Sequence, residues 1–288
     1  MIMIALVSAV FIYWIVLVRN KSVYGLTAFS EGKISWLSNI FLFVCSIIIV
    51  GALWSYVSES EQEGINKVPS PLEVILAFKA LLISGKLVEE SIASLIRIVV
   101  GFSMASLVGV FVGLAASSFI LVNRFVIPIN SFLRYIPPTA FISLLIVYFG
   151  IGETFKYAVI FFGVIFFIVQ MVIDVVDDLD KKYLEMAITS GMDNLKIFRK
   201  VIIPSSLPRI VDVLRINLSA AWTFLVAAEI VGAEKGLGHL IATSQRYLRI
   251  DDLFVGILTF GIIGIITDQL IRMISNYYLR WYYISINR

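Results

Sequence analysis

Charged side chains are scarce in this sequence: they make up 15% of its 288 residues, whereas hydrophobic residues make up 60%. A soluble domain is usually about half apolar and about a quarter charged. The mean hydropathy of +0.97 is correspondingly high. This composition excludes an ordinary soluble domain and predicts an integral membrane protein. The formal net charge of +3 is too small to indicate a nucleic-acid partner.

Cysteine and histidine are nearly absent, with one residue of each. Cys45 lies in an apolar run, so an intrachain disulfide is impossible and we expect a buried structural role. His239 has no cluster of other metal-binding residues in the sequence, so we expect a packing or surface role and no metal site. No Ser/His/Asp arrangement or carboxylate pair indicates catalysis, and the chain is expected not to be an enzyme.

A nucleotide-binding P-loop is also missing. The nearest match is Gly85-Lys86, but Ala80 stands in place of the first glycine and Leu87 in place of Ser or Thr. The chain is therefore expected to bind no cofactor itself. A partner must supply the energy for any active process.

Long apolar runs dominate what is present. A membrane helix needs about 20 mostly apolar residues. Residues 2–18 have no basic residue before their apolar core, and Arg19 and Lys21 follow them, which is the wrong charge order for a signal peptide. We therefore expect a retained helix and an all-α, polytopic membrane bundle. The seven predicted spans are residues 2–18, 37–57, 92–119, 125–149, 155–176, 210–231 and 253–277.

The charges of the loops predict the orientation, because cytoplasmic loops carry an excess of Lys and Arg. Basic residues gather between spans one and two, three and four, and five and six, and after span seven. The alternate loops are poorer in them, with Glu59, Glu61 and Glu63 after span two. We predict an external N-terminus, a cytoplasmic C-terminus and a cytoplasmic loop between spans five and six.

A short amphipathic helix is predicted between spans two and three. Ser70, Pro71 and Glu73 fit an N-cap, a first-turn proline and a capping-box glutamate, and Gly85 would end the helix. We expect its apolar face to lie along the outer membrane surface. The residues of that face are Ile75, Phe78 and Leu82.

Ionisable side chains inside the spans are costly and usually face the bundle interior or water. Each one either has a structural role, in an ion pair or with its charged end reaching the membrane interface, or lines a polar path. We expect Glu229 to pair with an arginine of a neighbouring span, which the sequence does not identify. The candidates are Arg97, Arg134, Arg215, Glu229, Asp268 and Arg272.

Pro137-Pro138 interrupts the fourth span about halfway along. Backbone breaks at membrane depth are tolerated where they are buried in protein or line a cavity. We predict that residues 134–139 line a translocation pathway, in which Arg134 would attract a small anion and Thr139 would donate a hydrogen bond. A packing kink without substrate contact is the alternative. Further predicted lining residues are Asn217, Ser219, Trp222, Thr223 and Glu229.

The polar segment at residues 178–204 separates spans five and six. Residues 181–190 have helix-forming character, Gly191 suits a left-handed C-cap, and residues 193–194 would cap a second short helix. Pro204 begins the return to the membrane. We predict a helix–glycine–helix elbow with an apolar tip and a basic rim. An ordinary amphipathic connector is the alternative.

This elbow resembles the coupling loop of ATP-binding-cassette (ABC) import permeases, whose pattern is E-A-A, three residues, Gly, nine residues, I-x-L-P. The matching positions are Glu185, Ala187, Gly191, Val201, Ile203 and Pro204. Met186 replaces an alanine of the pattern, and Val201 and Ile203 are conservative changes. Five segments between residues 68 and 283 look like the nitrate/sulfonate/taurine/bicarbonate branch: KVPSPLEV, SLIRIVVGF, RYIPPTAFISLLIVYFGIGE, IIPSSLPRIVDVLRINLSAAW and AAEIVGAEKGLGHLI.

The resemblance implies a six-helix type I importer permease domain at residues 37–288, with its coupling loop at about 178–204. Residues 1–36 would form an extra transmembrane helix and a cytoplasmic linker. The implied location is the bacterial inner membrane. The implied partners are a second permease copy, cytoplasmic ATPase subunits that hold ATP and Mg²⁺, and an external solute-binding protein. Gly232, Gly236 and Gly238 would form a gate or a docking surface for that binding protein.

The function that the resemblance implies is the translocation pathway of an ATP-driven importer for a small oxyanion or sulfonate, of the nitrate, bicarbonate, taurine or alkanesulfonate class. One alternative is a permease for a vitamin precursor, such as a thiamine pyrimidine or riboflavin. Another is a membrane scaffold or intramembrane enzyme, which would form no stable complex with a P-loop ATPase.

Overall fold

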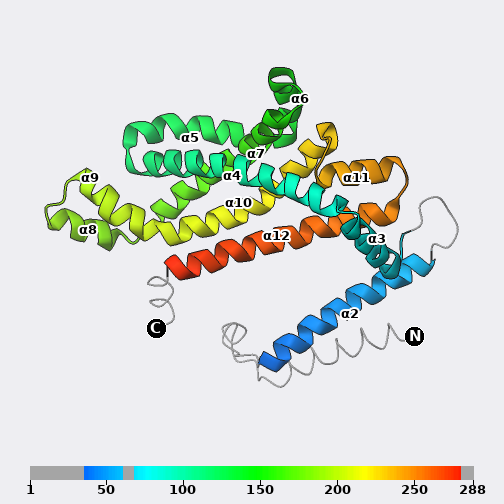
Figure 1. Cartoon of the computed structure of the whole chain (residues 1–288). Coiled ribbons are helices and arrows are strands. Elements are labelled where there is room, and N and C mark those ends of the chain that lie inside the picture. The colour runs from blue at the N-terminus through cyan, green and yellow to red at the C-terminus, as the bar shows by residue number, and fades with distance from the viewer. Residues whose placement is uncertain (1–35, 61–67, 280–288) are drawn as a thin grey trace. The chain divides into compact units, whose positions relative to one another are not determined.

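The computed structural model describes residues 36–60 and 68–279, and every regular element within these ranges is helical (Figure 1). The all-α prediction is confirmed for this part of the chain. In lipid, helices satisfy their backbone polar groups within one segment, which is why an apolar chain folds in this way. The elements are α2 (Trp36–Ser60), α3 (Pro71–Ile83), α4 (Lys86–Ser118), α5 (Ile120–Tyr135), α6 (Pro138–Phe149), α7 (Glu153–Asp177), α8 (Lys181–Thr189), α9 (Asn194–Ile197), a π-helical turn (Phe198–Ile202), α10 (Ile203–Gly232), α11 (Leu237–Arg246) and α12 (Ile250–Tyr278).

The chain divides into two compact units, residues 1–79 and 80–288. The first unit contains α2, which includes the predicted second span; its apolar stretch Val44–Glu59 is shorter than a full span. Cys45 on α2 is partly exposed and not buried as expected, because α2 leaves most of its apolar side chains uncovered. The predicted first span lies outside the described residues.

The predicted amphipathic helix is present as α3, and its capping box is confirmed. The Ser70 backbone N–H donates to Glu73 Oε2 at 2.7 Å, and the Glu73 N–H donates to Ser70 Oγ at 3.3 Å. After the last turn Gly85 has a φ of 76°, a conformation that glycine adopts without strain. Ile75 and Leu82 are exposed, and the buried positions are Val74, Ala77 and Leu81. The predicted face therefore points away from the protein.

Within the described residues, four helices are long and apolar enough to cross a membrane: Lys86–Ser118, Glu153–Asp177, Asn194–Gly232 and Ile250–Tyr278. A fifth candidate is the pair α5 and α6, which meet at 96°. The break falls at Pro137-Pro138, as predicted. Ile136 is extended, as residues before proline tend to be, and Pro138 is the first residue of α6.

The core of the second unit is built around α7, which packs against α4 and α10 (Figure 1). Gly109 and Gly113 let α4 approach α7 closely. A Cβ at Gly109 would lie 2.8 Å from Ile168, and one at Gly113 would lie 2.7 Å from Val172. Small residues four apart are a common means of helix association in membranes. This packing fixes the frame from which α10 and the polar elbow extend.

Candidate functional site

The elbow between α7 and α10 (residues 180–204) has the predicted helix–glycine–helix form. Asp180 caps α8, because its side chain accepts a hydrogen bond from the Lys182 N–H at 3.0 Å. At the other end the Met192 N–H donates to Ala187 O and the Gly191 N–H donates to Ile188 O. These two bonds form a Schellman motif, and the φ of 72° at Gly191 is the left-handed C-cap that the sequence predicts.

The second half of the elbow returns the chain to the bundle. Asp193 occupies the N-cap of α9 but makes no capping hydrogen bond with its side chain, and it lies 3.3 Å from Lys196 instead. The π-helical turn then leads into α10, whose first turn contains Pro204. The elbow is therefore continuous with the predicted sixth span.

The six residues that match the coupling-loop pattern fall into two groups. Glu185 is exposed on α8, and Gly191 forms the exposed turn. Ala187 is buried under the elbow, and Ile203 packs partly against the main core. Val201 is partly buried, and Pro204 is exposed. The pattern thus combines residues that build the elbow with residues that face outward.

The outer surface of the elbow carries uncovered apolar side chains beside its charges. Tyr183, Met186 and Ile188 on α8 are more than half exposed, and Leu195 on α9 is nearly so. Exposed apolar patches rimmed by polar residues mark interaction sites. The predicted tip and rim are both present, and the other apolar side chains of α8, Leu184 and Ala187, are partly or fully buried.

A cavity of about 740 Å³ lies between α10 and α12. On α10, Ile216, Ser219 and Thr223 follow one another at helical spacing and are exposed along it. Trp222 closes one wall, where its indole packs edge-on against Phe260 at 5.7 Å. On α12, Gly261 and Gly264 line the cavity without side chains that would fill it. The cavity is mainly apolar, with a few polar groups at fixed places.

The predicted pathway residues divide around this cavity. Trp222, Thr223 and Ser219 line it. Asn217 is buried away from it and donates to Val213 O at 2.9 Å. The segment at residues 134–139 is not among its lining residues: Arg134 lies in the last turn of α5 over the Tyr135 ring, and Thr139 is exposed on α6. The structure therefore places three of the five α10 candidates at this cavity, and neither Asn217, Glu229 nor the α5–α6 break lines it.

Three charged side chains line the cavity, Asp212 and Arg215 from α10 and Asp268 from the facing α12. Arg215 on α10 donates to Asp268 on α12 through Nε and one terminal nitrogen, both at 2.9 Å. Asp212 lies 3.4 Å from the same guanidinium. Both members of the main pair are partly exposed, with 24% of the Arg215 side chain and 35% of the Asp268 side chain accessible.

Glu229 pairs with Arg97, so the expected pairing with an arginine of another span is confirmed. The Arg97 guanidinium lies 2.7 Å from Glu229 Oε1, and the Glu229 side chain is fully buried. Ser94 Oγ donates to the same carboxylate at 2.8 Å. Arg97 also binds Glu153 on α7 through two nitrogens at 2.7 Å, and Lys156 binds Glu153 at 2.7 Å. Glu229 does not line the α10–α12 cavity.

The same buried network holds the start of α11. The Gly236 N–H donates to Glu90, the Leu237 N–H to Ser94 Oγ and the Gly238 N–H to Glu229 Oε2. These amides have no partner within the helix, and carboxylates at a helix N-terminus satisfy them. A Cβ on Gly236 would lie 2.4 Å from Glu229 Oε1. The two glycines therefore permit this close approach.

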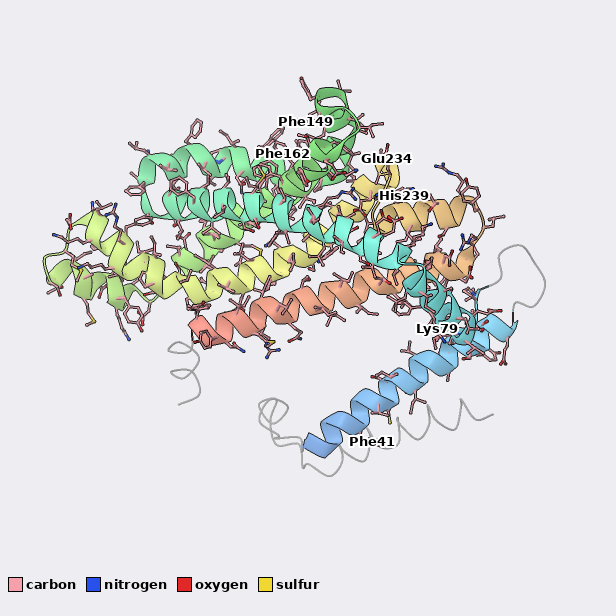
Figure 2. The ribbon with its side chains drawn as sticks, viewed as in Figure 1. Phe41, Lys79, Phe149, Phe162, Glu234 and His239 are labelled. Carbon is pink, nitrogen blue, oxygen red and sulfur yellow. The ribbon has the colours of Figure 1, made fainter. Side chains whose placement is uncertain are left out.

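The loop before this network is exposed at the surface. Figure 2 shows Glu234 on the connection between α10 and α11, with His239 on α11 beyond it. Lys235 Nζ donates to Glu89 at 2.5 Å, and this hydrogen bond raises the pKa of Lys235. His239 is partly exposed and faces Glu90 at 3.5 Å, in agreement with a packing or surface role.

Sequence reasoning missed four members of these clusters: Glu90, Glu153, Lys156 and Asp212. A signal for the first was present, because Glu90, Ser94 and Arg97 recur at the spacing of one helix face. Asp212 is likewise three residues before Arg215. Glu153 and Lys156 lie around the start of the predicted fifth span, and in the structure α7 begins at Glu153 and buries Lys156.

Comparisons with known proteins agree with this architecture. The model of the family described as "Binding-protein-dependent transport system inner membrane component" matches residues 98–278. A probable ABC transporter permease protein of Brucella melitensis is 33% identical over 76% of this chain and 89% of its own length. The putative aliphatic sulfonates transport permease protein SsuC of Escherichia coli is 31% identical over 85% of this chain and 93% of its own.

Two further relatives widen the comparison. The bicarbonate transport system permease protein CmpB of Synechococcus elongatus is 27% identical over 85% of this chain and 91% of its own. An inward-facing structure of the MetNI methionine ABC transporter superposes with a TM-score of 0.53 at 23% identity, over 65% of this chain and 91% of that one. The latter likeness concerns the fold alone and confirms a type I importer permease bundle.

The family match, the identity over most of the chain and the shared fold agree with one another. They describe a multi-pass membrane protein of a family of transport permeases, not of enzymes. This chain therefore belongs to the binding-protein-dependent inner membrane components, as an ABC importer permease of the branch that includes sulfonate, taurine and bicarbonate permeases.

Proposed function

We propose that this chain forms the translocation pathway of an ATP-driven importer for a small oxyanion or sulfonate, and that its elbow receives a cytoplasmic ATPase. The observation that carries the proposal is the elbow itself. It joins α7 to α10 through a Gly191 turn and presents apolar side chains to the outside. Such a surface suits a groove on a partner protein.

The build of the elbow supports transmission of movement. α8 is closed at both ends by its own hydrogen bonds, so it moves as one piece. The segment that leads from the elbow back into the bundle is helical from Asn194 to Gly232. Movement of α8 would therefore be transmitted along this helix to the wall of the α10–α12 cavity. This geometry supports a coupling between the elbow and the proposed pathway.

The proposal includes an assembly and an orientation. Two copies of this chain would enclose the pathway, two ATPase subunits would bind ATP and Mg²⁺ and dock on the elbows, and an external binding protein would deliver the substrate. The N-terminus would lie outside and the C-terminus in the cytoplasm, as the loop charges predict. The relatives named for sulfonates and bicarbonate support an oxyanion as the substrate class.

The elbow is tested with variants of its two outward-facing pattern residues. Glu185→Arg reverses an exposed charge, and Gly191→Pro forbids the φ of 72°, because proline fixes φ near −65°. We expect both to lose ATPase co-purification and substrate-stimulated ATP hydrolysis by at least about tenfold, which corresponds to about 1.4 kcal/mol of docking free energy. The variants are purified with the ATPase from membranes in which their insertion equals that of the wild type.

Two matched controls make this result specific. Gly191→Asn keeps the turn, since asparagine tolerates the left-handed region, and should retain most of the ATPase. Glu59→Arg reverses an exposed charge on α2 and should leave docking unchanged. Normal ATPase binding by both Glu185→Arg and Gly191→Pro would contradict the coupling role. Uptake of thiamine pyrimidines or riboflavin in place of oxyanions would contradict the substrate class.

A further inference from the structure

The ion pair between Arg215 and Asp268 occupies an expensive position. Arg215 lies near the middle of the 30-residue α10, and Asp268 lies about two thirds of the way along the 29-residue α12. Within the predicted spans, Arg215 lies five residues, about 7.5 Å, from the start of residues 210–231, and Asp268 lies nine residues, about 13.5 Å, from the end of residues 253–277, so both lie inside the apolar segments. Ionisable groups at such depth are rare and usually mark a polar path or site.

The pair opens into the α10–α12 cavity instead of being sealed. Both side chains line the cavity and are partly exposed to it. The pair of Arg97 with Glu229 is different, since it is buried and completed by Ser94 and by a backbone amide. A tether between helices gains nothing from an open cavity, because water weakens the attraction between the charges. Arg215 is therefore accessible to a small ligand from the cavity.

The geometry of the pair indicates which ligand that is. A guanidinium presents two parallel N–H groups that match the two oxygens of a carboxylate, and it binds other oxyanions in the same way. Asp268 currently accepts both of these bonds at 2.9 Å. A sulfonate or bicarbonate oxyanion has the same spacing of acceptor oxygens.

Resting on the proposed function, we infer that Arg215 is an oxyanion subsite within the cavity and that Asp268 occupies it when substrate is absent. An arriving oxyanion would exchange with the Asp268 carboxylate, and the charge on the guanidinium would be neutralised throughout. Asp212, at 3.4 Å, adds a second negative charge and keeps the anion weakly held. Weak binding suits a site from which the substrate must leave.

The walls above Arg215 fit the rest of such a ligand. Ser219 and Thr223 lie four residues apart on the face of α10 that lines the cavity, where their hydroxyl groups donate to the carbonyl oxygens of Ile216 and Ser219. Ile216, Val226 and Ile257 supply apolar surface. This combination suits a short aliphatic sulfonate, whose charged end meets Arg215 while its alkyl part meets the apolar wall.

Equilibrium binding of radiolabelled taurine and ethanesulfonate tests the subsite. The permease–ATPase complex is placed in nanodiscs of zwitterionic phosphatidylcholine, so that no anionic lipid competes for Arg215. Asp268→Asn should bind the probes about threefold more tightly or better, because it removes the internal competitor. Arg215→Gln should bind them at least about tenfold more weakly, because it removes hydrogen bonds to a charged group. Uptake is measured in parallel with the binding protein present.

Two further variants separate the subsite from a structural tether. The double variant Arg215→Gln/Asp268→Asn should bind as weakly as Arg215→Gln, although its neutral side chains still reach one another. Arg272→Gln removes a positive charge one turn from Asp268 and outside the cavity, and should change binding less than about twofold.

The results divide cleanly. Opposite effects of the two single variants support the subsite. Effects in the same direction, with the double variant restored, show a tether and overturn the subsite alone. A wild-type complex that assembles with its ATPase but neither binds nor transports the two probes or bicarbonate overturns the proposed substrate class, and the subsite with it.

Discussion

At the scale of single residues, Arg97 and Arg215 show how the same side chain serves two purposes within a membrane bundle. Arg97 is 6% exposed and donates to the buried Glu229, to the half-exposed Glu153 and to the Lys235 carbonyl oxygen. Arg215 is 24% exposed and meets its partners at the edge of a cavity. Burying a charge is tolerated only with full compensation. The Arg97 cluster therefore acts on stability, whereas Arg215 remains accessible to a ligand.

This difference predicts a large stability effect at Glu229. Glu229→Ala would leave Arg97 with one buried carboxylate fewer, and the N–H of Gly238 would lose its acceptor. Removing one member of a buried ion pair costs about 3–5 kcal/mol. We expect a correspondingly lower unfolding free energy in detergent, measured by denaturant titration of the purified protein.

The exposed neighbour Glu234 provides the control for this measurement. Glu234→Ala removes the same side chain five residues later and should change the unfolding free energy by less than about 0.5 kcal/mol. Equal stability of the Glu229 and Glu234 variants would show that the buried network does not hold α4, α10 and α11 together.

At the scale of helices, the ends of the elements follow from local sequence signals, whereas the ion pairs between helices follow from tertiary packing. The capping box of α3, the C-cap at Gly191 and the break at Pro137-Pro138 depend on residues close in sequence, and each was predictable. Arg97 and Glu229 are 132 residues apart, so their pairing depends on the packing of α4 against α10. No local signal specifies that packing.

The same limit applied to the faces of helices. All side chains of an apolar span look alike to a hydropathy pattern, whether they face protein, lipid or a cavity. The α10 candidates Trp222 and Thr223 line the cavity, whereas Asn217, from the same helix, is turned into the core. Residues 134–139 were favoured because a backbone break is visible in sequence, yet they do not line this cavity. That they contact substrate remains a prediction.

The contact between α4 and α7 leads to a prediction at this scale. A Cβ at Gly113 would already lie 2.7 Å from Val172 and 3.0 Å from the Val169 carbonyl oxygen, so Gly113→Val must push the helices apart. Overpacking of a well-filled core costs about 1–3 kcal/mol. We expect a lower denaturation midpoint in detergent and less folded protein in the membrane.

The matched substitution is Gly261→Ala on α12, where a Cβ would meet nothing within 4 Å. It should leave the midpoint unchanged or slightly raised, since alanine favours a helix over glycine. If Gly113→Val were as stable as Gly261→Ala, the close approach of α4 and α7 would not be a requirement of the fold.

At the scale of the whole molecule, one continuous helix connects the regions that the proposed transport cycle must couple. Helical structure continues from Asn194 at the elbow to Gly232, at the buried network that holds α11. α10 therefore links the proposed ATPase surface, the wall of the cavity and the opposite end of the bundle in one element. Movement at the elbow would alter access to the cavity without separating α4 from α7, because the contact between these two helices does not involve α10.

Access of water to the cavity provides the corresponding prediction. In a Cys45→Ser background, Thr223→Cys should react with a membrane-impermeant thiol reagent, because this position is exposed and lines the cavity. Leu225→Cys is the buried control, at 0% exposure, and Ile266→Cys is exposed but outside the cavity. Both controls should react slowly, since a thiol needs water to ionise.

The ATPase is then trapped in its ATP-bound state, and the labelling of Thr223→Cys is measured from the cytoplasmic side of inverted vesicles. If that side of the pathway closes, the labelling rate should fall by about tenfold or more, which corresponds to about 1.4 kcal/mol. Ile266→Cys should show no such change, because lipid surrounds it in either state. Equal labelling of Thr223→Cys and Ile266→Cys would place the cavity at the lipid boundary. The pathway would then have to run elsewhere, with the segment at residues 134–139 as the next place to label.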